Sequence, residues 1–140
     1  MKGKNPNTKT CGDELYLIDT YAWVEYFIGS ERGKEVKKII DDEDNTIVTP
    51  ECCLAEIKGW CIRENQDFEE LYSVVRKISD IECILTQDWL GAASLRSEMR
   101  KTKKDFGMMD ALILAQQKRM GCRVVSGDPH FKGLKNVILV

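Results

Sequence analysis

The sequence predicts an α/β fold of three layers, with an open parallel sheet of about five strands and helices on both faces. The first observation behind this prediction is that short apolar runs alternate with longer segments of helical periodicity. The second is that a helical segment lies between successive strands almost throughout, which favours parallel pairing through right-handed crossovers. In such sheets the functional crevice lies at the carboxyl ends of the strands.

The first strand is predicted at residues 15–18, an apolar run typical of a strand buried on both faces. A helix at 21–27 follows, with Thr20 as its N-cap and Gly29 at its end. Residues 30–42 form a second, exposed helix, and residues 46–49 form the second strand.

Pro50 is expected at the first position of the next helix, whose apolar side holds Ile57 and Trp60. A helix over 67–79 and a strand over 81–85 come next. The remaining elements are helices at 89–104 and 106–120, the latter ended by Gly121, and strands at 123–125 and 137–139.

Residues 15–140 are expected to form a single domain, and residues 1–14 a flexible leader without the apolar core of a signal peptide. No apolar stretch approaches the roughly 20 residues that cross a bilayer. The six cysteines lie mostly within apolar segments, and the sequence has one histidine and no C-x-x-C pair. We therefore expect reduced cysteines, no zinc site and a cytoplasmic protein.

The net charge of −2 argues against a protein that coats nucleic acid, since such binding depends on many basic contacts. It does not exclude a nuclease with an acidic site and a basic rim. The basic cluster at residues 100–104 is either such a rim or the cationic end of a helix, where its positive charge complements the helix dipole. Trp23 and Phe27 are expected in the core.

Two carboxylates are predicted at the carboxyl ends of strands, where this kind of fold carries its chemistry. Asp19 ends the first strand and Asp128 follows the fourth. Either residue could instead be structural, Asp19 as a helix cap and Asp128 as a turn residue before Pro129.

Two more carboxylates lie on apolar helix faces. Glu56 shares its face with Cys53 and Trp60, and Asp110 lies in a strongly apolar helix. A carboxylate there is costly unless it is paired, hydrogen-bonded or bound to metal, so the alternative for Asp110 is a salt bridge to Lys or Arg. Asp105 is a reserve acid, expected as the N-cap of the Asp110 helix.

If these four acids converge, each pair at 4 Å repels by about 4 kcal/mol at an effective dielectric near 20. Such a cluster requires raised pKa values or a cation, and all-oxygen ligands favour magnesium or manganese over zinc. Thr20 and Ser126 could orient Asp19, Asp128 or a water, although a helix cap and a turn hydroxyl are equally good roles.

Four segments together resemble the motifs of the PIN-domain family, in particular the VapC-type toxin ribonucleases of type II toxin–antitoxin systems. They are residues 17–27, 49–56, 106–115 and 124–134, in the family's order. The resemblance implies a magnesium- or manganese-dependent endoribonuclease that hydrolyses RNA, with Asp19, Glu56, Asp110 and Asp128 as catalytic metal ligands. It also implies a homodimer inhibited by a small cognate antitoxin.

Three alternatives are kept open. One is a PIN nuclease for RNA processing without an antitoxin, and another is a PIN-like scaffold that binds partners without catalysis. The third is a phosphoacceptor signalling domain, which would need an acidic pair before the end of the first strand and a lysine on the last strand. Asp13 and Glu14 precede the first strand and Lys135 precedes the last, so this third match is poor.

Overall fold

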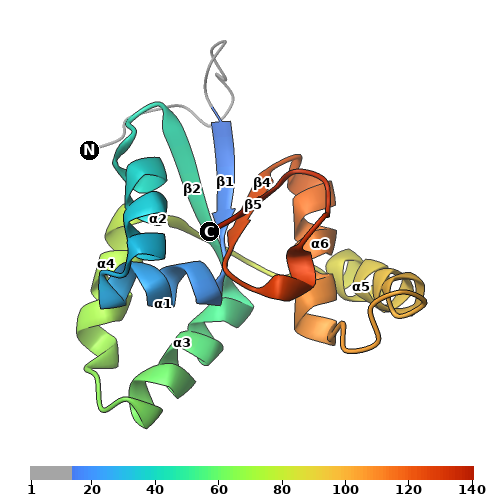
Figure 1. The fold of residues 1–140 in the computed structure, drawn as a ribbon, viewed down its shortest axis with the longest axis horizontal. Helices are drawn as coiled ribbons and strands as arrows, with labels where there is room; N and C mark the ends of the chain where they lie inside the picture. The colour runs from blue at the N-terminus through green and yellow to red at the C-terminus, as the bar shows by residue number, and fades with distance from the viewer. Residues whose placement is uncertain (1–13) are drawn as a thin grey trace.

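The computed structural model describes residues 14–140 and contains one parallel sheet covered by helices on both faces (Figure 1). The strands are β1 (Glu14–Ile18), β2 (Asn45–Pro50), β3 (Asp80–Glu82), β4 (Arg123–Ser126) and β5 (Val137–Leu139). The helices are α1 (Thr20–Ile28), α2 (Glu31–Asp41), α3 (Glu51–Arg63), α4 (Phe68–Ile78), α5 (Thr86–Met99) and α6 (Met108–Met120), with a 3-10 turn η1 (Pro129–Phe131). The leader predicted for residues 1–14 lies, apart from Glu14 in β1, outside the described residues.

The strand order is β3-β2-β1-β4-β5, and every neighbouring pair is parallel. The predicted three-layer α/β fold is confirmed. The alternative of a phosphoacceptor signalling domain is wrong, because the flavodoxin-like sheet of such a domain has the strand order 2-1-3-4-5, whereas β1 here lies between β2 and β4. Among residues 14–140, no helix has the length and apolar character needed to cross a membrane.

Each face of the sheet buries its own core. Helices α1 to α4 cover one face, where Ile18, Ile47 and Val125 pack against Trp23. Helices α5 and α6 cover the other face, where Leu17 meets the apolar side of α6 (Figure 1). Consecutive residues of β1 thus point into opposite cores, as the pleat of a strand requires. Trp23 is fully buried and donates from Nε1 to Thr49 Oγ1 at 3.0 Å, which confirms its predicted core position.

The ends of the first helices differ slightly from the prediction. Asp19, not Thr20, is the N-cap of α1, and Pro50 precedes α3 as its N-cap rather than occupying its first position. The predicted glycine stops are confirmed: Gly29 and Gly121 follow α1 and α6 in the left-handed conformation, with φ of 73° and 62°.

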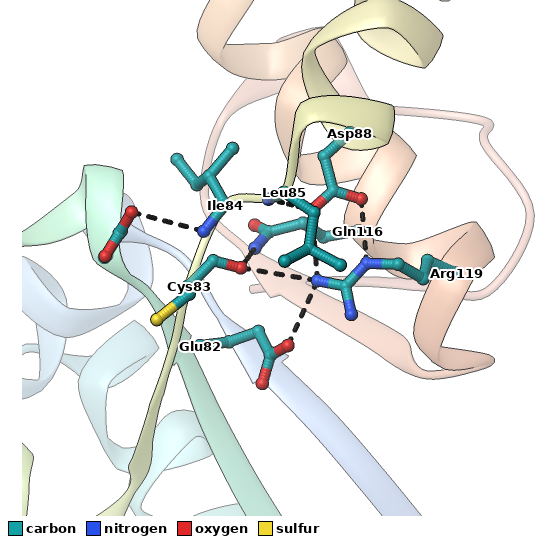
Figure 2. Close-up of polar contacts among 8 residues, drawn as sticks. Glu82, Cys83, Ile84, Leu85, Asp88, Gln116 and Arg119 are labelled. Carbon is teal, nitrogen blue, oxygen red and sulfur yellow. Dashed lines mark hydrogen bonds and ion pairs between the residues drawn. The ribbon is translucent and has the colours of Figure 1, made fainter.

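The strand predicted at 81–85 is wrong in its second half, since β3 is only Asp80–Glu82. The backbone beyond it bonds to side chains instead of a neighbouring strand (Figure 2). The Cys83 carbonyl accepts from Arg119 and, at 3.4 Å, from Gln116 Nε2, both residues of α6. Leu85 N donates to Asp88 Oδ2 at 2.9 Å, which starts α5 three residues before the predicted position.

The boundaries between α5 and α6 also correct the prediction. Helix α5 ends at Met99, not at residue 104, where the chain enters turns in which Lys101 N donates to Glu98 O and Thr102 N donates to Met99 O, both at 3.2 Å. Helix α6 begins at Met108 with Gly107 as its N-cap, so Asp105 does not cap it. Asp110 Oδ2 accepts from Gly107 N at 3.0 Å and thereby stabilises the first turn of α6.

An arginine of α6 ties α5 to the edge of the sheet. Arg119 donates to both carboxylate oxygens of Asp88, at 2.8 and 3.0 Å, and to Glu82 Oε1 at 3.0 Å (Figure 2). The Asp88 side chain is only 1% exposed. Burial raises the pKa of Asp88, but the hydrogen bonds from Arg119 and Leu85 N outweigh it and hold the pKa below its usual value. Asp88 is therefore a structural acid with its counter-charge in place.

We expect Arg119→Met to lower the free energy of unfolding by about 3 kcal/mol, because it leaves the Asp88 charge buried without a partner. Urea denaturation measures this loss. Lys118→Met on the exposed side of the same helix is the matched control and should change stability by less than about 0.5 kcal/mol. Equal stability of the two variants would show that the Arg119 pair does not hold α5 in place.

Candidate active site

A cavity of about 670 Å³ opens beside the carboxyl ends of β1 and β4. Between these two strands the chain order reverses, which is the topological switch point where open α/β sheets bind ligands. Its wall contains all four carboxylates predicted from the sequence: Asp19, Glu56, Asp110 and Asp128. The structure thus brings together residues from α3, from α6 and from the ends of two strands.

Asp19 is at the same time a helix cap and a wall of the cavity. Its Oδ1 accepts from Ala22 N at 2.9 Å, and its Oδ2 accepts from Ser126 Oγ. The residue is 6% exposed, and loss of water raises the pKa of Asp19 to about 7. The two hydrogen bonds lower this pKa, whereas the negative charges of Asp128 and Glu56 raise it further. Asp19 can therefore cap helix α1 and be a carboxylate of the site at the same time.

Ser126 joins the ends of the two central strands. Its hydroxyl donates to Asp19 and accepts from Asp128 N at 2.9 Å. The residue is fully buried, so its hydroxyl has no competing water. Ser126 thus contacts both acids that the sequence analysis assigned to strand ends.

Thr20 contacts a different acid from those considered in the sequence analysis. Its Oγ1 donates to Glu56 Oε1 at 3.0 Å and so holds the α3 carboxylate toward the start of α1. Partial burial raises the pKa of Glu56, the Thr20 hydrogen bond lowers it, and the charges of Asp110 and Asp128 raise it. Glu56 also lines the cavity.

Asp110 and Asp128 meet at a histidine that the sequence analysis did not assign to the site. His130 Nδ1 lies 3.0 Å from Asp110 Oδ2 and 3.6 Å from Asp128 Oδ1. The side chains of Asp110 and Asp128 are 16% and 22% exposed. One potential ligand atom of each residue, a carboxylate oxygen of Asp110 and of Asp128 and a ring nitrogen of His130, lies within 4.8 Å of the other two.

The charge balance of the cavity fits a divalent cation. Within residues 14–140, none of the four carboxylates pairs with a lysine or an arginine, so the salt bridge considered for Asp110 is wrong. Several ionised carboxylates in one wall repel each other unless protons or a cation compensate them. Oxygen donors of this kind suit hard divalent ions.

The rim of the cavity carries an aromatic ring and a cation. Tyr21 is 45% exposed and lies against Gly127, where a Cβ would come within 2.7 Å of Tyr21 Cδ1. Glycine between Ser126 and Asp128 therefore allows the ring to lie on the backbone of the site. Arg63 at the end of α3 contributes to the wall.

The other residues considered from the sequence lie away from the wall. Asp105 is exposed and is not part of the cavity wall, so it is no reserve ligand. The basic residues 100–104 follow the end of α5, and Lys103 Nζ donates to Lys132 O at 3.0 Å, just beyond η1. Cys52, Cys53, Cys61 and Cys83 are free thiols, as predicted.

Comparison with known proteins agrees with this geometry. Residues 16–136 match the PIN-domain family. A VapC ribonuclease of Mycobacterium bovis is 31% identical over 120 residues, which cover 84% of this chain and 89% of the relative, and ribonuclease VapC11 of Mycobacterium tuberculosis matches equally well.

Two solved structures share the fold. A toxin–antitoxin complex from Klebsiella pneumoniae has a TM-score of 0.70 at 18% identity and covers 88% of this chain and 95% of the other. The sarcin–ricin-loop-cleaving toxin VapC20 of Mycobacterium tuberculosis has a TM-score of 0.69 at 16% identity and covers 87% and 96%. From the match over nearly all of its described length and the identity to VapC ribonucleases, the chain belongs to the PIN-domain family and, within it, to the VapC ribonucleases.

Proposed function

We propose that this protein is a divalent-metal-dependent endoribonuclease that hydrolyses RNA phosphodiester bonds and acts as the toxin of a toxin–antitoxin pair. The observation that carries the proposal is one cavity at the switch point whose wall holds Asp19, Glu56, Asp110 and Asp128, none of which forms an ion pair with a lysine or an arginine among the described residues. A non-catalytic scaffold would not need to retain so unfavourable a set of charges.

Asp19, Glu56, Asp110 and Asp128 would hold the ion, with magnesium or manganese as the candidates. When bound, the ion supplies Lewis-acid stabilisation of the phosphate and makes a water more acidic. The chain's own contribution is to hold the ligands still before substrate arrives: Ser126 orients Asp19, Thr20 orients Glu56, and Gly107 N orients Asp110. Such supporting contacts typically change affinity or activity 10- to 100-fold.

Glu56 suits the role of proton acceptor for the attacking water. Its Oε1 accepts from Thr20, the residue lines the cavity, and burial raises its pKa above the usual value. Arg63 would contact an RNA phosphate, and the exposed ring of Tyr21 would stack on an unpaired base, which is how proteins commonly recognise single-stranded RNA.

A cognate antitoxin is the proposed partner, in line with the toxin–antitoxin complexes among the structures of the same fold. Its inhibitory segment would need to neutralise the acidic cavity, so we expect an arginine or lysine side chain to reach the carboxylates. The homodimer implied by the family resemblance stays a prediction.

We expect Asp110→Asn to lower RNA cleavage at least ~100-fold, because the amide cannot carry the charge that holds the ion. EDTA should abolish cleavage by the wild type. The assay is cleavage of a panel of structured RNAs by purified protein with magnesium or manganese. Asp105→Asn, an exposed acid outside the wall, is the matched control and should retain activity. Equal cutting by Asp110→Asn and the wild type would refute the metal-site proposal.

The pKa of about 7 for Asp19 predicts how stability changes with pH in EDTA-treated protein. Between about pH 4 and pH 7 the folded chain keeps a proton on Asp19 that the unfolded chain has lost, since an unperturbed Asp titrates near 3.9. The contribution of Asp19 to the free energy of unfolding therefore falls as pH rises through this window. Asp19→Asn keeps a capping side chain and should lack this decline.

Urea denaturation of both proteins from pH 4 to pH 8 measures this difference. Saturating manganese should reverse the trend for the wild type, because the ion binds the deprotonated site. A stability difference between wild type and Asp19→Asn that does not change with pH would contradict the raised pKa.

A further inference from the structure

The histidine at the site is held in position from three sides. His130 N donates to Asp128 Oδ1 at 2.9 Å, so the backbone of η1 is bound to one of the acids. Pro129 restricts the preceding backbone, and the ring lies 6.3 Å from the buried ring of Phe106. The Nδ1 atom is thereby directed at carboxylate oxygens of both Asp110 and Asp128.

This arrangement leaves two roles for Nδ1. In one, Nδ1–H donates to Asp110 Oδ2 and only positions that carboxylate. In the other, Nδ1 offers its lone pair to the same cation as the two carboxylates, and the single hydrogen of the neutral ring sits on Nε2. Asp110 already accepts from Gly107 N on the same Oδ2 atom, so its orientation does not depend on the imidazole.

We propose that His130 Nδ1 is a direct ligand of the divalent ion, which makes the centre a mixed nitrogen–oxygen site with Asp110 and Asp128. This inference rests on the proposed metal-dependent function. Two carboxylate oxygens and one imidazole nitrogen, all within 4.8 Å of one another, resemble the donor set of a transition-metal site more than that of an all-oxygen magnesium site. We therefore expect the site to bind manganese more tightly than magnesium, because the imidazole nitrogen is one of its ligands.

The chain has only one histidine, which makes the test unambiguous. Untagged full-length protein is loaded with Mn²⁺, and electron spin-echo envelope modulation records whether an imidazole nitrogen couples to the ion. Growth with ¹⁵N-histidine in an otherwise ¹⁴N protein labels this residue alone. We expect imidazole ¹⁴N modulation in the unlabelled wild type and its replacement by a ¹⁵N signal in the labelled protein.

Calorimetric titration with Mn²⁺ and Mg²⁺ supplies a second readout. His130→Gln should weaken Mn²⁺ binding on the order of tenfold and change Mg²⁺ binding much less, so that the preference for manganese narrows. Asp110→Asn should weaken both ions. Lys132→Gln, an exposed change just after η1, is the matched control and should leave both affinities unchanged.

The outcomes separate this inference from the proposed function. Saturable Mn²⁺ binding that Asp110→Asn weakens, without imidazole modulation in the wild type, overturns the His130 ligand and leaves the carboxylate metal centre intact. Absence of any saturable binding of either ion overturns both. Because the decisive signal is recorded on the wild type, it does not depend on whether His130→Gln folds.

Discussion

The parallel pairing of β1 with β4 is the constraint on which the site depends. These strands are far apart in sequence, yet Ile18 aligns with Val125, and Asp19 N continues the ladder to Val125 O at 3.2 Å. The carboxyl ends of the two strands therefore lie side by side, and the chain leaves both strands at the same place in the sheet. Ser126 at the end of β4 contacts both Asp19 and Asp128, which follow these strands, and no backbone rearrangement is needed to bring the two acids together.

Buried and partly buried acids in this molecule have opposite electrostatic environments. Asp88 is paired with Arg119, and its pKa is held below its usual value. Asp19 is buried among other carboxylates, and its pKa rises to about 7. The fold thus neutralises the acid that joins helix to sheet and leaves the acids of the cavity uncompensated. Such a contrast is the electrostatic signature expected of a functional cluster.

Most of the secondary structure followed from periodicity and from helix-stop residues, as at Gly29 and Gly121. The errors lie where long-range contacts compete with local preference. The apolar run after Glu82 has strand character, but its backbone bonds to side chains of three helices, α6 at the Cys83 carbonyl, α3 at Ile84 N and α5 at Leu85 N, and β3 ends early. The start of α6 is an exception with a local cause: the helix begins at Met108, not at residue 106, and the Asp110 carboxylate accepts from N of the N-cap Gly107 within the first turn.

Local patterns were enough to predict the α/β class, the order of the elements and the four acids as candidates, because a charge on an apolar face or at a strand end is visible as a break in a local pattern. Which of the acids meet, and which groups bond to them, depends on contacts between elements far apart in the chain, and these contacts exist only in the folded protein. His130 illustrates the difference: in the sequence it is a lone histidine after a proline, and no local spacing pairs it with Asp110, which lies 20 residues earlier. Its contact with Asp110 forms only in the folded chain, because β4 lies between α6, which carries Asp110, and η1, which carries His130.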